Sequence, residues 1–552
     1  MSRSRSVASS RRVAGAALPR WPAVSVAAVI LAIGAAHIVY LWFVCDDAYI
    51  SYRYAANLAH GFGPVYNPGE RVEGYSSFLW MILGATIIRL GGEPQVWMPL
   101  LSAVAALATL GLVMHAHHSR GMNLMPVGIL LAASPCFGAW GTGGLETALF
   151  TLTVTGGTLA LVRAIAPYSN PALGPAAGDG RPVEDALRFP LVSGFLLALA
   201  TLTRPEALFL SPIAGACLLH AVLRKRVRLR AWGAWVAIWS ACVAPQLAWR
   251  ASYYGRLLPN SFYIKSPGLP NVMDGLGYLL RSIRDLHLYL PILTAVVLFR
   301  AAGRARLRAA APGPIVAAIA IYGAYVTTTG GDFMPLYRFV APLMPWFALV
   351  AGAVMLAAHA AIAERWSRGA ALVVTASVLM GYSFLNIQRT LREPDPWTEG
   401  TLASVGLMRQ QVHDWGEVGR ELRQVSAPTD TLATTAAGII PYESRLHTLD
   451  LLGLNAPDLS RFRERKGMPG HRWLLSEEWL WRLAPQFLLG HPMVRPADRG
   501  IDLSLDLKPE WRERFGAEYQ LMAFPLSDWP PRQVGCMVRR DVASRVAAAG
   551  HE

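Results

Sequence analysis

The sequence CDDAYISYRY occupies residues 45–54 and directly follows an apolar run, residues 21–44. That run is longer than the roughly 20 residues with which an α-helix crosses the hydrocarbon core of a bilayer. It lacks a small-residue cleavage pattern, so it predicts a retained signal-anchor helix rather than a removed leader. The acidic pair Asp46 and Asp47 therefore stands at the end of the first predicted membrane span.

The composition agrees with a chain that is largely embedded in a membrane. Of 552 residues, 53% are hydrophobic and only 16% are charged, against about a quarter charged in ordinary soluble domains. The net charge of +15 comes from arginines in short clusters between apolar runs. This pattern is typical of cytoplasmic loops and argues against a nucleic-acid partner. The cysteines include no CxxC pair, so neither a zinc site nor a disulfide framework is predicted.

Apolar runs continue to about residue 385 and predict a mainly α-helical, polytopic membrane domain, residues 21–386, with about eleven spans. The predicted spans are residues 21–44, 96–116, 125–141, 145–165, 189–202, 205–223, 231–249, 286–299, 312–328, 336–361 and 370–385. A shorter run, residues 77–90, contains Trp80 and Arg89. It forms either a further span or a helix on the membrane surface.

Clusters of basic residues decide the orientation, because short loops rich in Lys and Arg stay in the cytoplasm. The clusters are the N-terminus, residues 1–20, and residues 224–230, 300–308 and 365–368. All of them fall on one side only if residues 77–90 lie along the outer face as an interfacial helix. The outer loop 45–76 and the other loops rich in Gly, acidic and aromatic residues then gather outside. This favours a site at the outer membrane boundary over a transport site at the midplane.

The chain becomes more polar after this point, and residues 387–552 predict an extracytoplasmic α/β domain that is large enough to hold its own core. An amphipathic helix is predicted over residues 412–423 and a further helix over residues 476–483. The predicted strands are residues 431–434, 447–451, 487–489 and 520–524. Within this domain His471 is a candidate for contact with a glycan, although a histidine in a turn is the commoner interpretation.

The acidic pair has two interpretations. Adjacent carboxylates repel each other, which raises the pKa of one of them, and such a group can accept a proton from a hydroxyl as a general base. Alternatively, the pair caps and charges the N-terminus of the helix predicted over residues 48–59. Between the two acids, Asp46 is the preferred catalytic candidate. Further charged residues nearby favour the functional interpretation, and they are Arg53, Glu70, Arg71 and Glu73.

A second cluster lies where two spans meet. The sequence TRPE, residues 203–206, places Arg204 and Glu206 at membrane depth. A charged pair there marks either a functional site or a structural ion pair that closes the turn. Glu146 follows a Gly-Gly turn and is the weakest candidate.

Two longer polar stretches complete the predicted outer face. The sequence TTTGGDFMPLYR, residues 327–338, offers Asp332 as a site acid or a helix cap. It also offers Arg338, whose planar and permanently charged guanidinium suits a phosphate. The sequence YYGRLLPNSFYIK, residues 253–265, places cations outside among aromatic residues that form a sugar platform or an interfacial belt. Its candidates are Arg256, Asn260, Tyr263 and Lys265.

In combination these stretches resemble bacterial glycosyltransferases of the GT-C fold, and among them the terminal arabinofuranosyltransferases of the actinobacterial cell envelope (the AftB type). The likeness rests on DDAYISYRY, NPGERVEGY, TRPE, LPNSFYIK and GGDFMP, and it covers about residues 21–385. It implies an enzyme of the plasma membrane that uses a polyprenyl-phosphate sugar donor on the outer face. Arabinofuranose is the expected sugar, and an envelope polysaccharide or glycolipid is the expected acceptor.

The resemblance also implies roles for individual residues. Asp46 or Asp47 would act as the base or position the acceptor, and Tyr54 lies in the same stretch as a substrate-binding candidate. The candidates for the donor phosphate are Arg338, Arg204, Arg256 and Lys265. Some members of this group need a divalent cation, whereas this sequence offers no firm set of metal ligands. Two rivals stay open: a transporter or flippase for lipid-linked glycans, and a non-catalytic envelope scaffold whose tail binds glycan.

Overall fold

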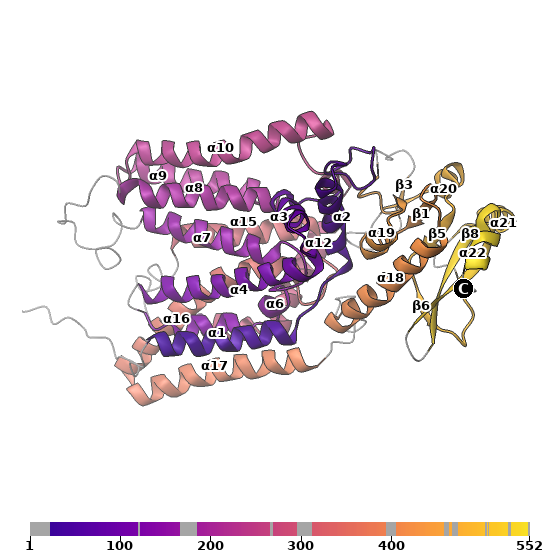
Figure 1. Ribbon diagram of the computed structural model, residues 1–552. Helices are drawn as coiled ribbons and strands as arrows, with labels where there is room; N and C mark the ends of the chain where they lie inside the picture. The colour runs from indigo at the N-terminus through magenta and orange to yellow at the C-terminus, as the bar shows by residue number, and fades with distance from the viewer. Residues whose placement is uncertain are drawn as a thin grey trace, which may run out of the picture.

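The computed structural model describes residues 23–119, 122–165, 185–264, 269–294, 312–392, 404–456, 463–465, 473–502, 505, 507–527 and 531–549. Long helices lie side by side in a bundle, and a mixed α/β part, referred to below as the tail, sits at one end of it (Figure 1). Short helices fill the junction between the bundle and the tail.

The bundle contains the apolar helices that the hydropathy pattern predicted. They are α1 (Ala23–Tyr40), α4 (Pro94–His118), α7 (Thr147–Ile165), α8 (Asp185–Thr203), α9 (Ala207–Leu223), α10 (Leu229–Tyr254), α15 (Gly313–Thr329), α16 (Met344–Arg365) and α17 (Arg368–Leu391). Within the described residues, five helical stretches are long and apolar enough to cross a membrane, and shorter apolar helices accompany them. The prediction of a mainly α-helical polytopic fold is therefore confirmed.

Two of the predicted spans are not continuous α-helices. Residues 125–141 divide into α5 (Met125–Ala132) and α6 (Pro135–Ala139). The break follows from Ser134 and Pro135, because the Ser134 hydroxyl accepts from the amide of Phe137 and proline suits the first turn of a new helix. The run 336–361 begins as a 3₁₀ helix, η2 (Arg338–Leu343), before α16 starts. The predicted span 286–299 is described only as far as residue 294.

The short helices at the junction position the site. α2 (Asp46–Ala59) and α3 (Phe78–Arg89) run across the direction of the long helices (Figure 1). At 12 residues, α3 is too short to cross a bilayer. The stretch 253–284, predicted as a loop, contains α11 (Asn260–Ile264) and the amphipathic α12 (Leu269–Asp285). The exposed apolar side chains of α12 are Met273, Leu276 and Leu280.

Two of the basic clusters lie at the opposite end of the bundle. The turn between α9 and α10 carries Arg224–Arg230, and the turn between α16 and α17 carries Arg365 and Arg368. Both turns lie at the end away from the tail (Figure 1). Their common position agrees with a common side of the membrane, and the assignment of that side to the cytoplasm stays a prediction.

The tail is an α/β unit built on one sheet. Its strands are β1 (Thr431–Thr434), β2 (His447–Asp450), β5 (Phe487–Gly490), β6 (Val494–Pro496), β7 (Tyr519–Leu526) and β8 (Arg532–Arg539), in the order β2-β1-β5-β8-β6 with β7 paired to β8. β1 runs parallel to β2 and β5, whereas β8 is antiparallel to its neighbours. A separate hairpin pairs β3 (Arg463–Arg465) with β4 (Trp473–Leu475). The helices are α18 (Val405–Val425), α19 (Ile439–Ser444), α20 (Glu477–Leu483), α21 (Pro509–Glu518) and α22 (Arg540–Ala549).

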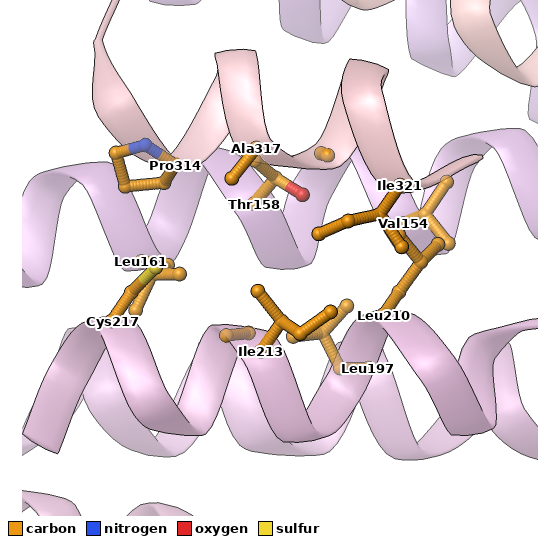
Figure 2. A pocket seen from close by; sticks show the side chains of 12 residues that line it. Val154, Thr158, Leu161, Leu197, Leu210, Ile213, Cys217, Pro314, Ala317 and Ile321 are labelled. Carbon is orange, nitrogen blue, oxygen red and sulfur yellow. The ribbon is translucent and has the colours of Figure 1, made fainter. Parts of the chain in front are cut away.

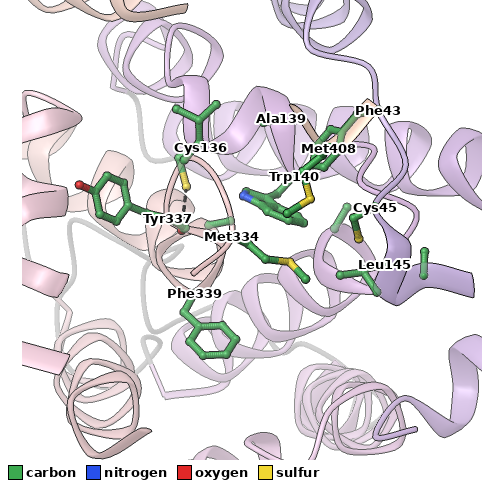
Figure 3. Packing of buried hydrophobic residues seen from close by; sticks show 14 of the residues in the cluster. Phe43, Cys45, Cys136, Ala139, Trp140, Leu145, Met334, Tyr337, Phe339 and Met408 are labelled. Atoms are coloured by element: carbon green, nitrogen blue, oxygen red, sulfur yellow. Dashed lines mark hydrogen bonds between the residues drawn. The ribbon is translucent and has the colours of Figure 1, made fainter. Parts of the chain in front are cut away.

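The bundle and the tail share one hydrophobic core. The largest buried cluster includes residues from α1 as well as residues from β5 and α22. At the junction, Met408 of α18 lies beside Phe43 and Trp140 of the bundle (Figure 3). The tail is therefore packed onto the end of the bundle by apolar contacts.

Candidate functional site at the junction of bundle and tail

Asp46 is the first residue of α2, and its carboxylate is bound by the tail. One oxygen accepts from the amide of Ile439 at 2.8 Å and the other from the amide of Gly438 at 3.2 Å. Burial raises the pKa of Asp46 to about 7, and the neighbouring charge of Asp47 adds to this while the two amides oppose it. The geometry favours a capping role for Asp46, although the helix that it caps is α19 and not its own.

Asp47 and Arg338 are close enough in the junction for their charges to interact. Neither carboxylate oxygen of Asp47 has a hydrogen-bond partner among the described residues, and the Asp47 charge acts on the Arg338 guanidinium. Both charges also act on the thiol of Cys45, which directly precedes α2. A carboxylate with unused acceptor oxygens beside an arginine is an arrangement that can bind a hydroxyl and a phosphate together.

Arg338 begins η2 and is held by a short polar loop. Its Nε lies 2.6 Å from Asp332, and its guanidinium lies over the rings of Trp140 (5.7 Å) and Phe339 (5.0 Å). The Nη groups make no hydrogen bond to any described residue. Asp332 therefore pairs with Nε, and the two Nη groups are available to donate to a ligand. No helix begins at Asp332, which pairs with Arg338 and accepts from the amide of Met334. The capping interpretation of Asp332 is therefore not favoured.

A buried ion-pair cluster adjoins Arg338. Arg204 donates to Glu146 at 2.8 Å and to Glu206 at 2.6 Å. The ring of Phe339 contacts both arginines, lying 5.4 Å from the Arg204 guanidinium and 5.0 Å from that of Arg338. Because two carboxylates already bracket Arg204, the geometry favours the structural ion pair for TRPE. Such a pair is costly to break once it is buried.

Other predicted site residues of the first outer loop join that loop to the tail. Arg53 is buried and donates to the carbonyls of Tyr66, Pro441 and Leu446 and to the side chain of Asn67. The Tyr54 hydroxyl donates to the Val72 carbonyl at 2.8 Å. Glu70 accepts from Asn67 and pairs with His447, which lowers its pKa against the effect of burial. These contacts favour structural roles over substrate binding.

The remaining candidates lie farther along the junction. Glu73 is buried against Arg250 of α10 at 2.9 Å, and burial raises its pKa to about 7 despite that arginine. The side-chain amide of Asn260 donates to carbonyls of residues 453, 454 and 456, again joining loop and tail. Arg71 is exposed and lies over Tyr253.

Arg256 lies over Tyr263 and donates to Asn260. Lys265 and His471 fall outside the described residues. The sequence pattern missed Arg250, which lies in the last turns of the largely apolar α10. A lone charge near membrane depth was its only signal.

An apolar groove runs between four helices of the bundle. It holds a cavity of about 20 Å³ and is lined from α7, α8, α9 and α15. Figure 2 shows the side chains of Leu161, Leu210, Ile213 and Ile321 around this space. Because α7 and α9 begin directly after Glu146 and Glu206, the groove starts about one to two helical turns below the Arg204 cluster.

Within the described ranges, no group of three or more His, Cys, Asp and Glu side chains is placed to hold a metal ion. Asp46 is already engaged by two amides.

Comparison with known proteins places this arrangement in a class. The fold matches that of ArnT from Cupriavidus metallidurans bound to undecaprenyl phosphate, with a TM-score of 0.54, 13% identity, and coverage of 94% of this chain and 98% of that one. Residues 404–543 match a family described as a domain of unknown function (DUF8728). The likeness to ArnT shows that the chain has the GT-C fold.

Two curated relatives make the resemblance more specific. A terminal β-(1→2)-arabinofuranosyltransferase of Corynebacterium glutamicum is 27% identical over 530 residues, covering 85% of this chain and 74% of the relative. The protein of the same name in Mycobacterium tuberculosis is 28% identical over 342 residues, covering 54% of this chain and 52% of the relative. The resemblance to this group, predicted from the sequence, is confirmed.

Proposed function

We propose that this protein transfers arabinofuranose from a polyprenyl-phosphate donor to a glycan of the cell envelope. The names of the two curated relatives support the sugar and the reaction. The undecaprenyl phosphate bound by ArnT supports a lipid-phosphate donor. The observation that carries the proposal is the electrostatic interaction of Asp47 with Arg338. Among the described residues, neither the carboxylate oxygens of Asp47 nor the Nη groups of Arg338 have a hydrogen-bond partner.

The proposed reaction assigns one role to each of these side chains. Asp47 accepts the proton of an acceptor hydroxyl, and the hydroxyl oxygen then attacks the anomeric carbon of the donor sugar. The bond between that carbon and the phosphate oxygen breaks, and the electron pair leaves with the polyprenyl phosphate. Arg338 stabilises the charge that develops on the phosphate, and Asp332 holds the guanidinium in place for this task.

The apolar groove suits the lipid part of the donor. Its lining is aliphatic apart from Thr158 and Cys217, so it matches an isoprenoid chain. Its upper end lies below the ion pair of Arg204 with Glu146 and Glu206, beside Arg338. A donor whose phosphate contacts Arg338 would lay its chain along this groove and present its sugar to Asp47.

The charge pattern of the chain supports a location of the site on the outer face. We place the junction and the tail, residues 387–552, on the outer face of the plasma membrane, because the basic turns lie at the opposite end of the bundle. The acceptor would then be an envelope polysaccharide or glycolipid. The tail would contribute to its binding while it also holds α2 in position.

A transfer assay with purified protein in detergent or nanodiscs tests the proposal. A panel of polyprenyl-phosphate sugars is offered together with an arabinan oligosaccharide acceptor, and product is detected by mass spectrometry. Transfer from the arabinofuranosyl donor, abolished in Asp47→Asn and Arg338→Ala, is the expected result. If no sugar is transferred, and the protein reconstituted in sealed lipid vesicles moves the intact lipid-linked sugar across their membrane, the transporter is favoured instead.

The groove has a test of its own. Ala318 lines it from α15, and Ala318→Phe should raise the KM for a donor with a long isoprenoid chain. A donor with a two-isoprene chain should be little affected, because it does not reach the blocked region. Equal effects on both donors would contradict this placement of the lipid.

A further inference from the structure

The loop that carries Arg338 adopts an unfavourable backbone conformation. Leu336 and Tyr337 have φ angles of 53° and 58°, in the left-handed region that L-residues with side chains rarely occupy. Such a conformation persists only where the surroundings enforce it, and it is common at functional sites. The position of Arg338 therefore depends on the contacts that hold the two preceding residues.

The backbone of this loop is fixed from the α6 side. The indole nitrogen of Trp140 donates to the Pro335 carbonyl at 2.9 Å, and the thiol of Cys136 donates to the Tyr337 carbonyl at 3.4 Å. Figure 3 shows the thiol facing that carbonyl, while the ring of Tyr337 points away from Trp140. The ring packs edge-on against Tyr278 of α12 at 5.2 Å.

The hydroxyl of Tyr337 reaches a buried carboxylate that the proposed reaction does not use. It donates to Asp285, the last residue of α12, whose side chain is only 7% exposed. Asp285 also accepts from Arg284 at 2.6 Å and pairs with Arg389 of α17. The end of α12 and the end of α17 therefore meet at the acceptor of the Tyr337 hydroxyl.

We propose that Tyr337 and Asp285 are positioning residues, which hold the Arg338 guanidinium in register with Asp47 by fixing the left-handed backbone directly before it. The inference rests on the proposed role of Arg338 as the ligand of the donor phosphate. A hydrogen bond to a buried carboxylate is stronger than one between neutral groups, and it connects the loop to two helices at once. Without it, the loop relaxes toward ordinary backbone angles and moves Arg338.

The main variant is Tyr337→Phe, which keeps the ring against Tyr278 and removes only the hydroxyl. It should weaken the binding of undecaprenyl phosphate, used as the probe, roughly tenfold. The KM for the donor should rise while the KM for the acceptor stays unchanged. Tyr322→Phe is the matched control, because Tyr322 is equally buried and its hydroxyl has no hydrogen-bond partner in the described part of the chain. Its donor KM should equal that of the wild type.

A double-mutant cycle distinguishes positioning from general support of the fold. In an Arg338→Lys background, Tyr337→Phe should cause little further loss of probe binding, because the guanidinium that Tyr337 positions is already absent. An equal loss of probe binding in both backgrounds, or a lowered Tm with unchanged probe binding, would overturn the inference. If Arg338→Lys binds the probe and transfers sugar like the wild type, it is the proposed function that fails.

A second pair of variants covers the case in which Tyr337→Phe does not fold. Asp285→Asn keeps an oxygen that accepts from Tyr337 and should retain probe binding within about threefold, whereas Asp285→Ala should match the loss expected for Tyr337→Phe. Equal probe binding by these two variants would also overturn the inference.

Discussion

At the scale of single residues, Asp46 and Asp47 are adjacent but differ in every contact. Asp46 is engaged by the amides of Gly438 and Ile439. Asp47 accepts no hydrogen bond from any described residue, and its charge acts on Arg338. A general base needs a free oxygen in reach of the acceptor. This reverses the preference for Asp46 that the sequence suggested.

Substitution of each acid by its amide should separate the two roles. Asp47→Asn should lower kcat by roughly 10²–10⁴-fold, the usual contribution of a general base, with an unchanged Tm. Asp46→Asn keeps one acceptor oxygen for the α19 amides, so it should lower kcat at most about tenfold and reduce the Tm. Steady-state kinetics and thermal unfolding in detergent measure both. A larger loss of kcat in Asp46→Asn than in Asp47→Asn would return the catalytic role to Asp46.

The protonation of Asp46 predicts a dependence of stability on pH. Its pKa is raised from 3.8 to about 7, mainly by burial, so the folded protein keeps this proton at a pH where the unfolded chain has lost it. The contribution of Asp46 to the free energy of unfolding should therefore fall as the pH rises from 3.8 to about 7. The Tm of the wild type minus that of Asp46→Asn, measured from pH 4 to pH 8, should decline over this window. The exposed Glu478→Gln is the control, and a pH-independent difference for Asp46→Asn would contradict the prediction.

At the scale of elements, α2 and α19 approach so closely that glycine is required between them. A Cβ on Gly438 would lie 2.0 Å from the backbone oxygen of Asp46. Gly438→Ala should therefore push α19 away from the start of α2, destabilise the protein by about 1–3 kcal/mol and reduce transfer. Gly516→Ala in α21 meets no atom within 4 Å and should be neutral or stabilising by up to about 1 kcal/mol. Equal stability of the two variants would show that α2 and α19 are not packed so closely at Gly438.

The elements also show where sequence reasoning succeeds. The spans were visible because twenty apolar residues have few alternatives to a membrane helix, and β1 was found at its observed bounds. The predicted strand 520–524 became the longer β7, and its partner β8 was missed. The break at Ser134 and the helix α12 were missed as well. Each of these depends on local capping or on tertiary packing that hydropathy does not record.

The site was predictable to a similar degree. The acids and arginines beside the junction stood out because charge is rare near membrane spans. Their partners did not, since Arg250 is 177 residues from Glu73 and Tyr337 is 52 from Asp285. Whether a charge is free or engaged depends on such distant partners. For this reason Arg53 and Arg204 were predicted to bind substrate, whereas their contacts in the fold favour structural roles.

At the scale of the whole molecule, the tail is packed into the bundle and is not an appended module. Arg53 of α2 donates to the carbonyls of Pro441 and Leu446 in the tail. Asn67 exchanges hydrogen bonds with the backbone of Thr448. In the other direction, Arg409 of α18 donates to the carbonyls of Tyr40 and Trp42 at the end of α1. One buried cluster continues from the bundle into the tail. We therefore expect the two parts to unfold together.

Arg53→Lys tests this coupling. Lysine carries one ammonium group in place of the planar guanidinium, so several of the buried acceptors of Arg53 are left without a donor. The free energy of unfolding should fall by about 2–4 kcal/mol. Because these contacts join the bundle to the tail, calorimetry of Arg53→Lys should show one unfolding transition, shifted as a whole to lower temperature. The rate of sugar transfer should fall as well, since α2 carries Asp47. Arg482→Lys, on an exposed ion pair of α20, should change stability by less than about 0.5 kcal/mol. The prediction is contradicted if the wild type unfolds in two transitions and Arg53→Lys shifts only one of them, because the tail would then fold independently of the bundle.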